Sequence, residues 1–116
     1  MSIENSIENV KIALAIRTAR AAIGWNQQEF AELMGVAKST VARIETLEMS
    51  AKADFLNKAM RLFRDSGVFV DLYELDRLPL EINKVCIEIA QKRLVDESLR
   101  RSDRRTGIAS LLDNHD

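Results

Sequence analysis

The sequence predicts a mainly α-helical fold: a bundle of four to five helices, a short strand at about 68–73 and a long C-terminal helix. Apolar residues recur at intervals of three and four through most of the 116-residue chain, which is the period of an amphipathic helix. Gly24, Gly35 and Gly67 follow three of these stretches, at positions where helices commonly end. Strict alternation of apolar residues begins only after Gly67, which indicates a strand.

The composition is that of a soluble globular protein with a modest core. Apolar residues make up 47% of the chain and charged residues 30%. No apolar run approaches the length of a membrane span, and residues 1–9 do not resemble a signal peptide. The single cysteine excludes an internal disulfide and suits a reducing compartment, so we expect a cytoplasmic protein.

The first helix is expected over residues 10–23 and ends before Gly24. Its apolar stripe consists of Ile12, Ile16, Ala19 and Ile23. Ser6 or Asn5 is expected to cap it, because small polar side chains accept hydrogen bonds from the first N–H groups of a helix. Trp25, the only tryptophan, follows the glycine, and we interpret it as a core residue.

Two short helices joined by a tight turn are expected within residues 27–45. Gly35 ends the first of them, since glycine adopts a positive φ without strain. The second begins at about Lys38. The residues directed inward are Phe30, Ala31 and Met34 on the first helix and Thr40, Val41 and Ile44 on the second. The outward, mainly polar face of the second helix carries Lys38, Ser39, Ala42 and Arg43. This spacing predicts a helix-turn-helix.

A known family has the same pattern. The chain resembles the Xre-like helix-turn-helix proteins, the phage repressor and Cro type, over the stretch IRTARAAIGWNQQEFAELMGVAKSTVARIE. The resemblance covers about residues 12–68 and implies a repressor-like domain over 10–66 that binds double-stranded DNA, with 67–116 as an extension. The formal net charge of −1 predicts weak non-specific binding, because phosphate contacts supply much of the affinity for DNA.

The resemblance implies that the helix from Lys38 to Glu45 is a recognition helix, with base contacts from Lys38, Ser39 and Arg43. Lysine and arginine donate to O6 and N7 of guanine in the major groove. Ala42 is expected to touch a thymine methyl group.

Phosphate contacts are implied at Asn26, Gln27 and Thr40. A phosphate contact at Gln27 and Gln28 is also expected on physical grounds, because the free N–H groups and the dipole at the start of a helix favour a bound phosphate. Such contacts fix the register of the protein on DNA but carry no sequence information.

The resemblance further implies an ion pair between Arg20 and Glu45, which would hold the first helix against the recognition helix. The chain departs from the family in the loop 46–52. Leu47 and Ala51 stand there in place of the usual glycine and proline.

The C-terminal half is expected to contain a helix at 53–66, the strand at 68–73 and no second strand, because Leu75–Leu80 has no Asn-Gly or Asp-Gly turn. Two interpretations of the lone strand stay open. It pairs with the same strand of a second chain across a two-fold axis, or it is an extended connector covered by the last helix.

Pro79, the only proline, is expected to start the longest helix, from Glu81 to about Leu99. The apolar sector of this helix is too wide for one core contact, which favours a partner protomer on its second side. Cys86 is interpreted as a core residue, and the tail from about residue 100 as solvated or disordered. The expected dimerisation residues are Val68, Phe69, Val70, Leu72, Val85 and Ile89.

Together these patterns favour a transcription regulator, a repressor that binds an inverted-repeat operator as a homodimer. The alternative is an antitoxin, whose segment 67–116 binds a toxin while its helix-turn-helix regulates its own gene. We expect neither an enzyme nor a cofactor. The only histidine, His115, lies near the end of the sequence, and neither a phosphate-binding glycine loop nor metal-ligand spacing is present.

Overall fold

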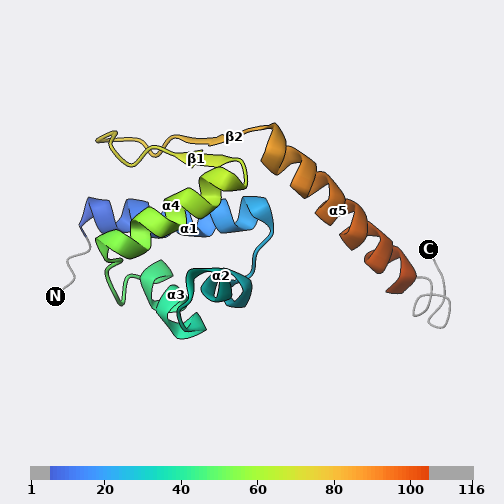
Figure 1. Cartoon of the computed structure of the whole chain (residues 1–116), viewed down its shortest axis with the longest axis horizontal. Coiled ribbons are helices and arrows are strands. Elements are labelled where there is room, and N and C mark those ends of the chain that lie inside the picture. The colour runs from blue at the N-terminus through green and yellow to red at the C-terminus, as the bar shows by residue number, and fades with distance from the viewer. Residues whose placement is uncertain (1–5, 105–116) are drawn as a thin grey trace.

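The computed structural model describes residues 6–104, and this part of the chain forms a helical body with a two-stranded sheet and a long last helix (Figure 1). The elements are α1 (Ile7–Ile23), α2 (Gln27–Met34), α3 (Lys38–Glu45), α4 (Ala53–Asp65), β1 (Val68–Val70), β2 (Leu80–Ile82) and α5 (Lys84–Arg104). The mainly helical fold expected from the sequence is confirmed. Within the described residues, no helix combines the length and the apolar content that a membrane span requires.

Helix α1 begins three residues earlier than expected, directly after Ser6. The Ser6 hydroxyl accepts a hydrogen bond from the Asn9 N–H at 3.2 Å, so the expected capping residue is confirmed. The helix ends at Gly24, whose φ of 99° lies in the left-handed region.

Helices α2 and α3 have the bounds expected for the helix-turn-helix. Asn26 and Glu29 form a capping box at the start of α2, in which each side chain accepts a hydrogen bond from the other residue's N–H. Gly35 ends α2 with a φ of 74°. The turn to α3 therefore depends on a residue without a Cβ atom.

The core of the helical body lies between α1, α2, α3 and α4. Its fully buried side chains include Ile16, Phe30, Val41 and Phe63. Phe30 stacks on Phe63 at 5.3 Å between ring centroids, and the ring of Trp25 lies 6.1 Å from Phe30 and 6.2 Å from Phe63. The interpretation of Trp25 as a core residue is therefore confirmed.

The expectation of a lone strand is wrong, because β1 pairs with β2 of the same chain. The register is antiparallel, with Val68 opposite Ile82, Phe69 opposite Glu81 and Val70 opposite Leu80. Pro79 precedes β2 instead of starting a helix, and its carbonyl accepts the Asp71 N–H at 3.0 Å. The structure thus removes the argument for strand pairing between two chains, since that argument required an unpartnered β1.

Helix α5 begins at Lys84, three residues later than expected, and extends away from the helical body (Figure 1). The Asn83 side chain accepts the Val85 N–H at 2.9 Å and so caps this helix. The helix continues through Arg104, so residues 100–104 of the expected tail are helical, and its remainder lies outside the described residues.

The extension expected at 67–116 shares its first residues with the core of the helical body. Val68 and Cys86 are each 1% exposed and belong to the same cluster of buried residues as α1–α4. The interpretation of Cys86 as a core residue is confirmed. The expectation that Val68 contacts a partner is wrong, because its side chain is already covered by its own chain.

Candidate nucleic-acid interface

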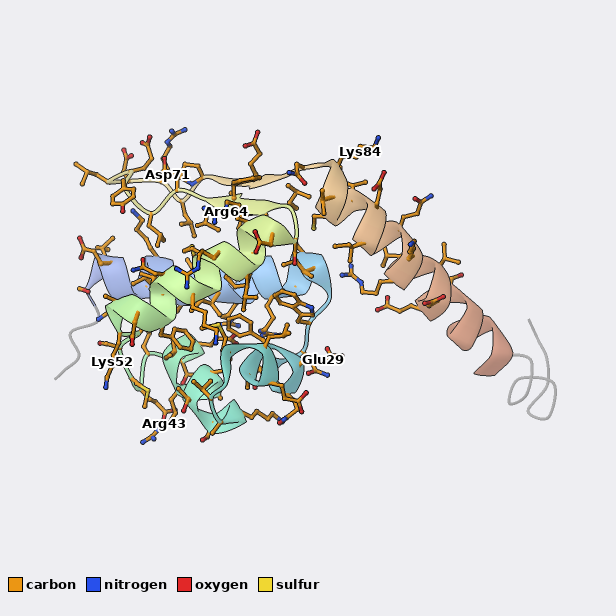
Figure 2. The ribbon with its side chains drawn as sticks, viewed as in Figure 1. Glu29, Arg43, Lys52, Arg64, Asp71 and Lys84 are labelled. Carbon is orange, nitrogen blue, oxygen red and sulfur yellow. The ribbon has the colours of Figure 1, made fainter. Side chains whose placement is uncertain are left out.

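Helix α3 has one buried face and one exposed face. Val41 and Ile44 hold it against the body and are 0% and 4% exposed. Lys38, Ser39 and Arg43 lie on the exposed side, and Figure 2 shows Arg43 pointing outward from α3, away from the body. Thr40 is half-buried at one border of this face, and Ala42 is half-buried beside Lys38. The four expected base-reading residues therefore share one accessible strip.

Arg43 has a neighbour that the sequence did not suggest. Its Nε lies 4.0 Å from a carboxylate oxygen of Glu48, and both side chains are more than half exposed. The chain turns back after α3, because the Arg43 carbonyl accepts the Glu48 N–H at 2.8 Å. An ion pair this long and this exposed adds little stability, so Arg43 can leave Glu48 for a DNA base at small cost.

Arg20 and Glu45 are in direct contact, as the resemblance implies. Arg20 donates two hydrogen bonds to the Glu45 carboxylate, from Nε at 2.8 Å and from Nη2 at 2.9 Å. The Glu45 side chain is only 3% exposed. Arg20 also donates to the carbonyl of Trp25 at 2.9 Å. This bidentate pair ties α1 and the corner after it to the end of α3.

Gln27 belongs to the same network instead of pointing into solvent. Its side-chain amide donates to Glu45 Oε1 at 2.9 Å. The Asn26 side chain is used in the capping box, and Gln28 donates to Glu32 at 2.9 Å. The side chains of these three expected phosphate contacts therefore already have partners within the chain. The N–H groups of Gln27 and Gln28, in the first turn of α2, have no acceptor within that helix and can donate to a phosphate.

Residues 16–64 match the family model described as helix-turn-helix. Over this segment the chain is similar to the Xre-like helix-turn-helix family. The match contains α2 and α3 complete, the C-terminal part of α1 from residue 16 and nearly all of α4. It therefore includes all eight residues expected to contact DNA and both members of the Arg20–Glu45 pair.

Among solved structures, the chain is similar to the clp gene regulator ClgR from Corynebacterium glutamicum. The TM-score is 0.49 and the sequence identity 16%, over 85% of this chain and 89% of the other. Comparison with curated protein sequences gives no match.

The helix-turn-helix domain departs from ordinary backbone geometry directly after its recognition helix. Leu47 has a φ of 68°, the only positive φ of a non-glycine residue in the described part of the chain. This is the loop in which the sequence lacks the family's usual glycine. The chain follows the path that a glycine would permit, at a conformational cost to Leu47.

Cys86 joins α5 to the helix-turn-helix domain and has no features of a reactive thiol. Burial raises the pKa of the Cys86 thiol, and the nearby Arg93 guanidinium opposes this rise only in part. Both residues approach the end of α1, where Arg93 donates to the Ala22 carbonyl at 3.0 Å. Within the described residues, no group of three acidic, cysteine or histidine side chains is placed to hold a metal ion.

Proposed function

We propose that this protein represses transcription by binding an inverted-repeat operator in double-stranded DNA as a homodimer. The observation that supports the proposal most is the division of α3 into two faces. Val41 and Ile44 anchor it from behind, while Lys38, Ser39 and Arg43 are exposed on the other side. A short helix anchored in this way can enter the major groove and present side chains to base edges.

The roles of the side chains follow from their chemistry. Lys38 and Arg43 donate to guanine O6 and N7, and Arg43 can do so through two parallel hydrogen bonds. Ser39 is short and discriminates less between bases. Ala42 contributes a methyl group for apolar contact with thymine.

Contacts with the DNA backbone are few in this proposal. They come from the N–H groups of Gln27 and Gln28 and from Thr40 at the border of the exposed face. A protein that neutralises few phosphates has a shallow dependence of affinity on salt, so selectivity rests on the bases that α3 contacts.

One recognition helix reads too few base pairs to select a site, so the proposal requires two copies. Half-sites about 34 Å apart, one turn of DNA, would place two α3 helices on the same face of the duplex. Helix α5 is the element that we propose for dimerisation. Val85, Ile87, Ile89, Leu94 and Val95 are exposed on it, and exposed apolar groups on one element favour a protein partner.

Substitution of Arg43 tests the DNA-binding proposal. Arg43→Ala should lower affinity for the preferred operator by about 1–3 kcal/mol and relax the preference at one base position in each half-site. Arg77→Ala is the matched control, because Arg77 is also an exposed arginine paired with a glutamate but lies outside α3. Affinities measured by fluorescence anisotropy should separate the two variants. Equal affinities for both would reject the assignment of Arg43.

The exposed side chains of α5 also favour a second candidate function, an antitoxin that binds a toxin through this helix. Copurification of the chain with the proteins of its own operon distinguishes the two. A stoichiometric small partner that is lost on substitution of Ile87 and Leu94 supports the antitoxin, and a homodimer without such a partner supports the plain regulator.

A further inference from the structure

A cavity of about 690 Å³ lies behind the recognition helix, between α3, the end of α2 and the start of α4. Its volume falls in the range of about 300–1,000 Å³ that is typical of small-molecule sites. Its apolar lining includes Met34, Val36, Ile44 and Phe55. Met49, from the loop after α3, lies at its margin and is partly exposed. Two methionines in such a lining adapt readily to ligands of different shape.

The polar lining of this cavity is mainly cationic. Lys52, Lys58 and Arg61 line it, against a single carboxylate from Asp54. Lys58 of α4 donates to the Met34 carbonyl at 3.2 Å. Its ammonium group therefore lies at the C-terminal end of α2. Within the described residues, none of the three cations forms an ion pair with a carboxylate. The cavity therefore combines an apolar lining with an excess of positive charge.

We propose that this cavity binds a small amphipathic carboxylate, an aliphatic acid whose chain lies on Met34, Val36 and Phe55 and whose carboxylate is held by Arg61 and Lys58. The proposal rests on the proposed function, because it makes the acid a regulator of DNA binding. Opposite charge selects the head group, and burial of the chain supplies most of the affinity.

The position of the cavity couples the ligand to DNA recognition. Ile44 lines it from the buried side of α3, and Thr40 lines it from the border of the exposed strip. Ile44 also anchors α3 to the core, so a ligand that packs against Ile44 changes the seating of the recognition helix. The negative charge of the ligand also reduces the positive potential beside α3, where Lys52 lies directly before α4 (Figure 2). Both effects weaken binding to the operator.

Titration calorimetry with three probes tests binding on the full chain without DNA. Octanoate should bind one molecule per protomer with a dissociation constant below about 1 mM, as expected for a ligand of ten heavy atoms. Acetate lacks the apolar chain and octylammonium reverses the charge, so each should bind at least tenfold more weakly. A dissociation constant for octanoate above this limit, or an equal affinity for octylammonium, would overturn the proposal.

Two charge reversals on α4 locate the site. Arg61→Glu should weaken octanoate binding at least tenfold. Arg64→Glu is the matched control, because Arg64 is exposed on the same helix but lies outside the cavity lining, towards the hairpin end of α4 (Figure 2). It should change octanoate affinity by less than twofold. Equal losses in both variants would show a general charge effect and reject the site.

The regulatory step is measured separately, as operator affinity with and without saturating octanoate. Saturating octanoate should lower the operator affinity of the unmodified protein several-fold and leave that of Arg61→Glu unchanged. If octanoate binds but leaves operator affinity unchanged, the regulatory part of the proposal is wrong. Failure to bind any duplex in the absence of octanoate would instead reject the proposed function and leave the calorimetric result standing.

Discussion

At the scale of single residues, the helix-turn-helix depends on a few polar contacts made behind the exposed strip of α3. Glu45 lies at the end of α3 with a nearly buried carboxylate, and Arg20 and Gln27 both donate to it. The resemblance to the Xre-like family was sufficient to predict the contact with Arg20. The contact with Gln27 could not be predicted, because a glutamine at a helix start serves equally well as a phosphate contact, and only coordinates show where its amide points.

Arg20→Ala should destabilise the fold strongly. It removes two hydrogen bonds to Glu45 and leaves a carboxylate in the core without its cation, which costs about 3 kcal/mol. For a domain of this size that corresponds to a fall in melting temperature on the order of 10 °C. Arg17→Ala, on the exposed side of the same helix, should change the melting temperature little. A similar melting temperature for both variants in calorimetry would show that the Arg20–Glu45 pair adds no stability.

Leu47→Gly should stabilise the protein. Leu47 occupies the left-handed region at a cost of about 1–2 kcal/mol that glycine does not have, and the loss of its half-buried side chain offsets part of the gain. We expect a net increase in unfolding free energy of about 0.5–1 kcal/mol in urea denaturation. Met49→Gly, in the same loop but at an ordinary φ, should lower it. Equal destabilisation of Leu47→Gly and Met49→Gly would show that the positive φ of Leu47 costs the fold no stability.

At the scale of elements, helices with a strong apolar period were predictable and the hairpin was not. Gly35 and the inward residues of α2 and α3 set the bounds of both helices correctly. Strand β2 was missed because its three residues follow Pro79, which also suits a helix start, and because the long connection from β1 lacks a characteristic turn. The Leu80 and Ile82 alternation, followed by Asn83 as a helix cap, was the signal available in the sequence.

At the same scale, we predict that the exposed apolar side chains of α5 form the contact between two copies of the chain. Ile87→Glu and Leu94→Glu together should convert the proposed homodimer to a monomer in light scattering. Both side chains are more than half exposed, and the substitutions would place carboxylates in an apolar interface. The far-ultraviolet circular dichroism should stay unchanged. Leu75→Glu is the control, since Leu75 is 89% exposed but lies between β1 and β2. A dimer that survives the double substitution would exclude this face of α5 as the contact.

At the scale of the whole molecule, the surfaces that we propose for DNA and for a partner lie on different parts of the chain. Helix α3 lies on the side of the body opposite the hairpin, and α5 extends from one end of it (Figure 1). This separation lets two copies associate through α5 while both α3 helices remain exposed. The formal net charge of −1 is compatible with DNA binding, because a local group of exposed cations, here Lys38 and Arg43 on α3 with Lys52 before α4, is sufficient.

Recognition of DNA by two α3 helices is tested by selection of bound sequences from a pool of random duplexes with the purified full chain. We expect enrichment of one inverted repeat whose half-sites lie about one helical turn, roughly 34 Å, apart, and no enrichment by a variant that combines Lys38→Ala with Arg43→Ala. Recovery of the same sequences by that variant, or no enrichment by the unmodified chain, would contradict this mode of recognition.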